Sequence, residues 1–429
     1  MERFTIRVDD AILDDLRQRL ARIRWPDQPD GGGWDLGTDL AYLRGLVEYW
    51  REGFDWRGVE ERLNSFAHFT TTIDGQRIHF VQVRGRGARS LPLVLTHGWP
   101  STFAELLPVV PALTDPLDES DAFDVVLPSI PGFGFSGPHT ARGPRRVHDL
   151  WATLMGELGY ERFGACGSDI GARITSRLGW YHPDRLIGIH LSSVDLEVPD
   201  PLPDDLSDAE RDHIAREERW EREEGAYAAQ QATRPQTLAY GLTDSPVGLA
   251  AWIVEKFQAW SDCNGDIASR FSYDELLTTI TLYWVTGTIN SANRWYYESR
   301  HDPAPLRLPP GVRIEVPTGV AMFPGEAELV VPRSMVERCY QVRRWTDMPR
   351  GGHFPALEEP DLLVEDIRAF FRPLRDRGWS DADSEAREQD VHQRADRDGV
   401  DDGADAERAP KQPADRHHAH LDPGAHDPQ

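Results

Sequence analysis

Short, largely apolar runs bounded by turn residues recur through the middle of the chain and constrain its fold more than any other feature. They occupy residues 92–96, 123–128, 163–166 and 186–191. Runs of this kind suit strands that are covered on both faces, as in a parallel sheet with helices on each side. A helical pattern over residues 147–158 separates two of them. This alternation predicts an α/β fold with a mainly parallel sheet.

The spacing of apolar residues divides the chain into segments. It is helical up to about residue 75, and after about residue 195 the strand rhythm stops and a helical, aromatic-rich stretch follows. After about residue 374 large apolar side chains almost vanish, so burial cannot offset the entropy lost on ordering. The predicted segments are a helical N-terminal extension packed on the core (1–90), the first part of an α/β core (91–194), a helical lid (195–310), the second part of the core (311–373) and a disordered acidic tail that contains histidines (374–429).

Composition narrows the classes of partner. The formal net charge of -25 argues against nucleic acid and anionic membranes as partners, because both would repel the chain. Nearly all the positive charge is arginine, which we interpret as genome composition, with adaptation to high salt as the weaker alternative. The three cysteines are far apart and match no disulfide framework or zinc-ligand spacing. No apolar run is long enough for a signal peptide or membrane anchor, so we expect a cytoplasmic protein.

The sequence Gly167-Ser168-Asp169-Ile170-Gly171 lies between a predicted strand and a helix-like run. In α/β-hydrolases the nucleophile sits on a sharp turn at this place, with small residues two positions before and after it. With Ser168 as the nucleophile, one of these positions would be the branched Ile170. With Asp169, both are glycines. We therefore predict an α/β-hydrolase fold with Asp169 as the nucleophile, although the motif alone fits equally a turn in which Asp169 caps a helix.

A carboxylate nucleophile attacks sp³ carbon and forms an alkyl ester that water must then hydrolyse. A strained ring or a halide leaving group fits this chemistry. Hydrolysis needs a general base, and His353 follows two glycines in a late loop, in the chain order expected for the histidine of this fold. The loop His97-Gly98-Trp99-Pro100 follows a predicted strand, which predicts that the Trp99 and Ile170 amides form an oxyanion hole.

The acid that orients His353 should follow a strand between the nucleophile and the histidine. Residues 313–323 read as such a strand, and Glu326 comes shortly after it. We therefore choose Glu326. Glu328, two residues on, and Asp195, after an earlier strand, are the alternatives, and spacing alone does not separate Glu326 from Glu328.

Together these pieces resemble the microsomal-type epoxide hydrolases, including the juvenile hormone branch, and in particular soluble bacterial members. The similarity extends over about residues 3–373. The motifs that carry it are His97-Gly98-Trp99-Pro100, Pro131-Gly132-Phe133-Gly134-Phe135-Ser136, Gly167-Ser168-Asp169-Ile170-Gly171, the segment 244–253 and Gly351-Gly352-His353-Phe354. The segment 244–253 makes the set specific, because it has no obvious reason to recur in other α/β-hydrolases. The resemblance implies a helical lid and an N-terminal domain that wraps the hydrolase core.

The resemblance also implies site residues. Two lid tyrosines act as ring-opening acids in the family. Gly225-Ala226-Tyr227, ahead of a Gln-x-Thr-x-Pro run, matches the first, and Arg294-Trp295-Tyr296-Tyr297 matches the second at Tyr296, with Tyr297 as a neighbouring alternative. The family acid matches Glu326 in Phe323-Pro324-Gly325-Glu326.

We therefore predict an enzyme, an epoxide hydrolase that converts a small apolar epoxide and water into a vicinal diol through an ester on Asp169. It would use no metal and no organic cofactor. One alternative is a haloalkane or haloacid dehalogenase with the same Asp and His, which would need halide-binding donors such as indole N–H groups. Another is a hydrolase-fold protein that binds ligands without turning them over. The natural epoxide and a homodimeric state stay open.

Overall fold

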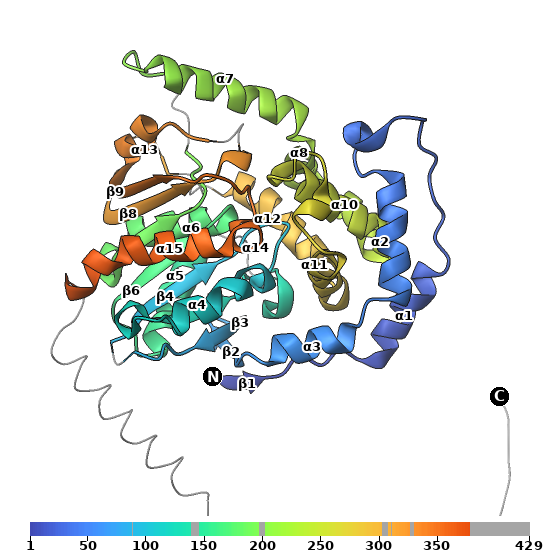
Figure 1. The fold of residues 1–429 in the computed structure, drawn as a ribbon, viewed down its shortest axis with the longest axis horizontal. Coiled ribbons are helices and arrows are strands. Elements are labelled where there is room, and N and C mark those ends of the chain that lie inside the picture. The colour runs from blue at the N-terminus through green and yellow to red at the C-terminus, as the bar shows by residue number, and fades with distance from the viewer. Residues whose placement is uncertain are drawn as a thin grey trace, which may run out of the picture. The chain divides into compact units, whose positions relative to one another are not determined.

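The computed structural model describes residues 1–87, 89–138, 146–196, 202–302, 308–309, 311–326 and 330–377. Within these residues nine strands form one sheet in the order β1-β2-β3-β5-β4-β6-β7-β8-β9 (Figure 1). The strands are β1 (Glu2–Phe4), β2 (His68–Ile73), β3 (Gln76–Val83), β4 (Leu91–Thr96), β5 (Phe123–Pro128), β6 (Phe163–Gly167), β7 (Leu186–Leu191), β8 (Ile314–Met322) and β9 (Tyr340–Asp347). Beyond residue 377 the predicted tail lies outside the described residues.

The strands from β5 to β9 in this order all pair in parallel, and β1, β2 and β3 add antiparallel pairs at one edge. Both faces of the parallel part are buried. In β4, for example, Leu93 and Leu95 pack in one apolar cluster and Val94 in another. The prediction of an α/β fold with a mainly parallel sheet is confirmed, and the apolar runs are strands because alternate side chains fill two cores.

Helices cover both faces of this sheet. Residues of α5 and α6 share the cluster of Val94, and residues of α4 and α15 share the cluster of Leu93. The helices are α1 (Asp10–Leu20), α2 (Leu40–Glu52), α3 (Trp56–Asn64), α4 (Val110–Thr114), α5 (Val147–Glu157), α6 (Ile170–Tyr181), α7 (Asp208–Glu223), α8 (Ala226–Thr233), α9 (Pro235–Asp244), α10 (Pro246–Trp260), α11 (Tyr273–Thr286), α12 (Ile289–His301), α13 (Arg333–Cys339), α14 (Pro355–Glu358) and α15 (Pro360–Phe371). No helix among the described residues has both the length and the apolar character needed to span a bilayer.

The outer strands β1, β2 and β9 were not anticipated from the sequence. They carry polar and half-exposed residues, as in the Arg343-Arg344 pair of β9, so they lack the apolar runs that mark the central strands. The segment 1–90, predicted as a helical extension, therefore also contributes three strands to the sheet. Edge strands are half-solvated, and their sequences are correspondingly less diagnostic.

The helices α7 to α12 lie between β7 and β8 in the sequence, and the N-terminal helices α1 and α2 lie beside α10 and α11 (Figure 1). Specific hydrogen bonds join the two sets. Thr38 Oγ1 donates to the carbonyl oxygen of Ala251 at 2.7 Å, and Arg19 Nη1 donates to the Asp244 carboxylate at 2.7 Å. The N-terminal segment therefore helps to hold the helical insertion in place.

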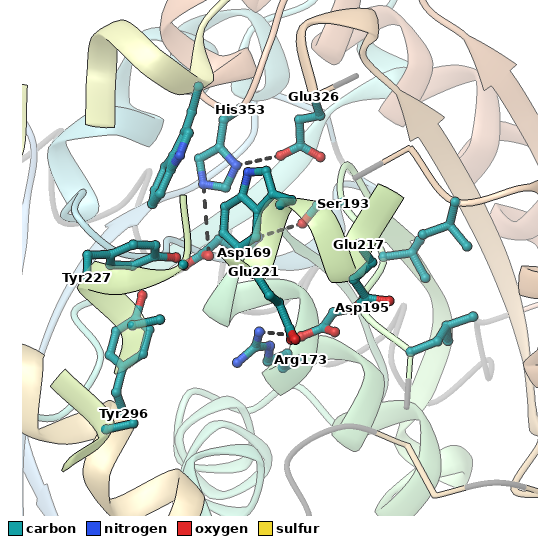
Figure 2. A pocket seen from close by; sticks show the side chains of 18 of the residues that line it. Asp169, Arg173, Ser193, Asp195, Glu217, Glu221, Tyr227, Tyr296, Glu326 and His353 are labelled. Carbon is teal, nitrogen blue, oxygen red and sulfur yellow. Dashed lines mark hydrogen bonds and ion pairs between the residues drawn. The ribbon is translucent and has the colours of Figure 1, made fainter. Parts of the chain in front are cut away.

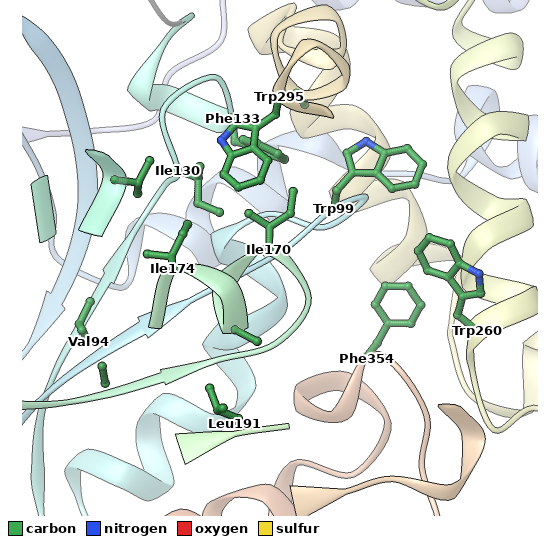
Figure 3. Packing of buried hydrophobic residues seen from close by; sticks show 14 of the residues in the cluster. Val94, Trp99, Ile130, Phe133, Ile170, Ile174, Leu191, Trp260, Trp295 and Phe354 are labelled. Carbon is green, nitrogen blue, oxygen red and sulfur yellow. The ribbon is translucent and has the colours of Figure 1, made fainter. Parts of the chain in front are cut away.

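The core beneath the insertion combines aliphatic and aromatic side chains. Figure 3 shows Val94, Ile174 and Leu191 packed around the sheet and α6, with Trp99 and Trp260 on the side of the insertion. All five are buried. The contact between Trp99, which follows β4, and Trp260, at the end of α10, joins the insertion to the carboxyl ends of the parallel strands. In α/β proteins, binding sites lie at these strand ends.

A buried carboxylate connects three elements of the core. Asp366 on α15 is within 2.8 Å of His190 Nε2 on β7, accepts from Thr346 Oγ1 at 2.6 Å, and pairs with Arg344 at 2.6 Å, both on β9. Burial alone would raise its pKa, but the His190 hydrogen bond and charge, with Thr346 and Arg344, lower the pKa of Asp366 to about 2. Asp366 therefore stays ionised and ties two strands to the covering helix.

We expect Asp366→Asn to lower the free energy of unfolding by about 3 kcal/mol near neutral pH, because it removes one partner of a buried ion pair. The lowered pKa makes this contribution present above about pH 4 and lost as the pH falls toward about 2. Urea unfolding at several pH values measures both effects. The exposed Glu365→Gln on the same helix is the control and should change stability by less than about 0.5 kcal/mol. Equal stability of Asp366→Asn and the control near neutral pH would contradict the assignment.

Candidate active site

The sharp turn after β6 is built from close backbone contacts. Asp169 adopts φ 51°, in the region that favours glycine, and α6 begins at the next residue, Ile170. A Cβ on Gly167 would lie 2.2 Å from the carbonyl oxygen of Gly171, and a Cβ on Gly171 would lie 2.0 Å from that of Thr96. Both positions therefore need glycine, which accounts for the spacing in the sequence and leaves Asp169 at the tip of the turn.

Hydrogen bonds hold both the carboxylate and the backbone of Asp169. The Trp99 N–H donates to Asp169 Oδ1 at 2.8 Å. The Asp169 N–H donates to Ser193 Oγ at 2.7 Å (Figure 2). A Cβ on Gly98 would lie 2.3 Å from Asp169 Oδ1, so the loop can approach only with glycine there. Ile170 begins α6, and first-turn amides have no acceptor within their helix. Of the two amides expected to form the oxyanion hole, that of Trp99 bonds the Asp169 carboxylate. The other, that of Ile170, belongs to the residue directly after Asp169, at the start of α6.

His97 supports this loop from inside the protein. Its Nδ1 lies 3.0 Å from the Gly98 carbonyl oxygen, and its Nε2 accepts from the Ile130 N–H at 3.2 Å. Burial lowers the pKa of His97 to about 4, against a smaller opposing effect of the Gly98 hydrogen bond. A neutral imidazole that donates through Nδ1 and accepts through Nε2 satisfies both contacts. His97 of the His-Gly pair therefore stabilises the conformation of the loop through these two hydrogen bonds.

His353 lies between two carboxylates. Its Nδ1 is 2.5 Å from Glu326 Oε1, and its Nε2 is 3.9 Å from Asp169 Oδ2. The backbone of the preceding glycine makes this possible, because a Cβ on Gly352 would lie 2.7 Å from the Trp260 carbonyl oxygen. That same oxygen accepts from the His353 N–H at 2.9 Å. The three residues Asp169, His353 and Glu326, which the sequence proposed together, are thus brought together.

The two carboxylates set the ionisation of the imidazole. Burial of His353 opposes its charged form, but the hydrogen bond and charge of Glu326, followed by the charges of Asp169 and Glu105, outweigh burial and raise its pKa to about 9. In this state His353 carries a proton near neutral pH. The charge of Asp169 contributes to that state, so neutralising Asp169 would lower the pKa of His353 and leave more of it as the free base.

The alternatives for the histidine's partner lie elsewhere. Asp195 forms an ion pair with Arg173 on the cavity wall. Glu328 lies outside the described residues. Of the candidates that the structure describes, Glu326 is the one in contact with His353.

Two tyrosines of the insertion face the Asp169 carboxylate across the cavity (Figure 2). Tyr227 comes from α8 and Tyr296 from α12, with ring centroids 5.9 Å apart. Trp99 stacks almost parallel on Tyr227 at 5.1 Å and meets Tyr296 edge to face at 5.8 Å. Tyr297 is exposed, stacks on His301 and does not line the cavity.

Burial is the main cause that raises the pKa of both cavity tyrosines well above the usual range. The negative charge of Asp169 adds to this effect at each, and the charge of Arg173 opposes it. Both side chains are therefore neutral phenols that can donate hydrogen bonds. Two protonated donors that face the same side of a carboxylate can hydrogen bond to an oxygen of a bound substrate and stabilise negative charge that develops on it.

The cavity that contains these groups has a volume of about 470 Å³. The indoles of Trp220 and Trp260 line it with the two tyrosines, whereas Arg173, Asp195 and Glu217 add charge on another wall. Sequence analysis missed Ser193 and Arg173. Their positions in the sequence could have indicated both residues. Ser193 comes shortly after β7, the strand beside β6, and Arg173 lies one helical turn after Asp169.

Among the described residues, one group of His and Asp side chains is close enough together to hold a metal ion, and it lies outside this cavity. It consists of His148 and Asp149 on α5 and His182 after α6. Asp149 already accepts from Arg146 at 2.5 Å and is 2.7 Å from His182 Nε2. These contacts account for the group as an ion-pair cluster between two helices, so no metal is needed to explain it.

Comparisons with known proteins agree with this geometry. The family described as "Epoxide hydrolase N terminus" matches residues 1–106, and the family described as "alpha/beta hydrolase fold" matches residues 92–360. Epoxide hydrolase 1 of Sus scrofa is 36% identical over 412 residues, covering 86% of this chain and 87% of that protein. The chain belongs to the epoxide hydrolase family. Its predicted enzyme class and α/β-hydrolase fold are thereby confirmed.

Further similarities support the family assignment. A protein of Stigmatella aurantiaca named "Putative epoxide hydrolase" is 43% identical over 380 residues, covering 87% of this chain and 85% of that protein. The structure of Aspergillus niger epoxide hydrolase has a TM-score of 0.75 and 31% identity, over 88% of this chain and 96% of that one. This epoxide hydrolase therefore shares its fold and most of its length with its relatives, and the non-catalytic alternative is set aside.

We expect Gly98→Ala to reduce epoxide hydrolysis by about a hundredfold or more, because its methyl group would displace the Asp169 carboxylate and small misplacements of reacting groups have large kinetic effects. Steady-state kcat/KM on a panel of epoxides measures this, with circular dichroism as a check on folding. Gly241→Ala on α9 is the matched control, since its Cβ would meet nothing within 4 Å. It should keep full activity. Unchanged activity in Gly98→Ala would show that the loop does not need this close approach.

Proposed function

We propose that this epoxide hydrolase opens its substrate by attack of Asp169 on an epoxide carbon. The observation that carries the proposal is the position of the Asp169 carboxylate, with Oδ1 bonded to the Trp99 N–H and Oδ2 3.9 Å from His353 Nε2. A bond forms between Asp169 and the ring carbon while the carbon–oxygen bond of the ring breaks. The products of this step are an alkyl ester and an oxygen that needs a proton.

Tyr227 and Tyr296 supply the proton in this proposal. An unprotonated alkoxide is a poor leaving group because it is far more basic than a phenol. The two phenols that face Asp169, one buried and one partly buried, would hydrogen bond the ring oxygen, and one would transfer its proton as the bond breaks. The aromatic rings around them suit an apolar substituent on the epoxide.

His353 would act in the second step. It removes a proton from water, the resulting hydroxide attacks the ester carbonyl, and the Trp99 and Ile170 amides stabilise the oxyanion. Glu326 holds the imidazole through Nδ1, which leaves Nε2 for the water. Breaking the ester releases the diol and regenerates Asp169, and the proton that remains restores the tyrosine. Formation of the ester removes the charge of Asp169, one of the causes that raise the pKa of His353, and so frees the base when it is needed.

The geometry favours this reaction over dehalogenation with the same Asp and His. A halide site needs converging donors, commonly indole N–H groups. The Trp99 Nε1–H is already bonded to Asn293 Oδ1 at 3.2 Å, whereas the Trp260 Nε1–H has no hydrogen-bond partner among the described residues. The hydroxyl groups that face Asp169 belong to tyrosines, which donate protons to a leaving oxygen, whereas a halide leaves without one.

A His353→Gln variant tests the proposal directly, because blocked hydrolysis should trap the ester. We expect intact-mass and peptide mass spectrometry to show a gain equal to the whole epoxide on the peptide that carries Asp169, and steady-state turnover to fall by about a thousandfold or more. A gain equal to an alkyl group after halide loss, with no epoxide adduct, would identify a dehalogenase. An epoxide adduct on another residue would remove Asp169 from the mechanism. Asp169→Asn, which lacks the nucleophile, is the control and should show no adduct.

The pKa of His353 predicts how the second step, ester hydrolysis, depends on pH. Only the neutral imidazole accepts a proton, so ester hydrolysis should rise with pH and then level off. Its apparent pKa should lie below the value of about 9 in the free enzyme, because esterified Asp169 no longer stabilises the imidazolium. Single-turnover rates across neutral and alkaline pH give the first value, and NMR titration of the free enzyme gives the second. An apparent pKa equal to or above that of the free enzyme would contradict this coupling.

A further inference from the structure

The chain contains two lysines among its 47 lysine and arginine residues, Lys256 and Lys411. Every other cation is arginine, so the sequence has no general tendency to use lysine. Lys256 is also buried, with 5% of its surface exposed. Buried lysines are rare because an ammonium loses strong hydration. A lysine at this position of an arginine-based protein therefore calls for a local explanation.

The Lys256 ammonium lies over the ring of Tyr227. Its Nζ is 4.7 Å from the Tyr227 ring centroid and 5.6 Å from the Trp260 ring, both within the range of cation–π attraction. Trp99 stacks on the same tyrosine at 5.1 Å with an interplanar angle of 8°. The counter-ion of Lys256 is Glu255, at 2.6 Å, which is partly exposed. Tyr227 is thus held between an indole and a cation, next to Asp169.

We propose that Lys256 is a positioning residue for ring opening, whose ammonium orients Tyr227 and stabilises the negative charge that this tyrosine acquires as it protonates the epoxide oxygen. This inference rests on the proposed role of Tyr227. In that step the Tyr227 O–H bond breaks, the proton goes to the ring oxygen, and the electron pair stays on the phenolate. The proton left after ester hydrolysis restores the hydroxyl.

The charges around Tyr227 explain why such a cation is useful. Asp169 and Asp195 both oppose negative charge on the phenol, and Arg173 favours it from the hydroxyl side. Lys256 adds a second positive charge from the ring side. A cation interacts more strongly with a phenolate than with a neutral phenol, and the buried setting reduces screening by water. The contribution of Lys256 therefore grows as the proton is transferred, which is the condition for accelerating the step.

The identity of the residue fits this role. An ammonium is a compact point charge on a flexible stem, whereas a guanidinium is planar and wider. Lys256 lies on α10, and its ammonium is near the Trp260 ring as well as the Tyr227 ring. A compact cation can enter this space and still reach Glu255 with the same atom.

A double-mutant cycle separates this role from simple packing. Lys256→Met keeps the length of the side chain and removes its charge. We expect rapid-quench mass spectrometry to show ester formation on Asp169 slowed about tenfold or more, with ester hydrolysis changed less than about twofold. In a Tyr227→Phe background the same substitution should slow ester formation less than about twofold. In a Tyr296→Phe background, where Tyr227 is the remaining acid, the full effect should persist.

Equal losses with and without the Tyr227→Phe substitution, a loss confined to hydrolysis, or no loss would overturn the inference. Failure of the proposed function gives a different result, because Tyr227→Phe alone would then leave ester formation unchanged. If Lys256→Met does not fold, Glu255→Gln provides the test on a partly exposed residue. Removing the counter-ion should leave ester formation at least as fast as in the unmodified enzyme, and a tenfold fall would overturn the inference.

Discussion

The turn between β6 and α6 is the constraint on which the rest of the site depends. Asp169 can occupy its strained backbone conformation only because Gly167, Gly171 and Gly98 allow three segments to approach within contact distance. The strain is held by the central strands β4 and β6, which are buried on both faces. A rigid sheet therefore fixes the position of the carboxylate, and the other groups are placed relative to it.

The charges of the site are balanced around that carboxylate. His353 lies between Glu326 and Asp169, and its raised pKa depends on both. The opposite wall carries the Arg173–Asp195 ion pair. Because these groups are buried or partly buried and lie close together, a change in the charge of one alters the proton affinity of the others. A reaction that first neutralises Asp169 and later regenerates it can thus use one histidine in two protonation states.

The acids of the proposed mechanism come from the insertion, and their placement depends on the N-terminal segment. Thr38 bonds to α10 and Arg19 to α9, and α9 packs against the two helices that carry the tyrosines, α8 and α12. Trp99 then links the two parts of the site, since its amide bonds Asp169 and its indole stacks on Tyr227. The N-terminal extension is therefore part of what holds the site together, although it contributes no residue to the cavity among those described.

The sequence by itself determined the central sheet and the position of Asp169, because both follow from local rules. Strands buried on both faces need apolar runs, and the sharp turn needs glycines at two spaced positions. The sequence favoured Glu326 and Tyr296 but could not show their contacts. Only the tertiary structure brings Glu326 to His353, turns Tyr296 rather than Tyr297 to the cavity and places Lys256 over Tyr227. The edge strands β1 and β9, and β2 beside β1, also emerged only there, since they have no apolar run. These outcomes depend on how segments far apart in the chain pack together, which spacing within one segment does not encode.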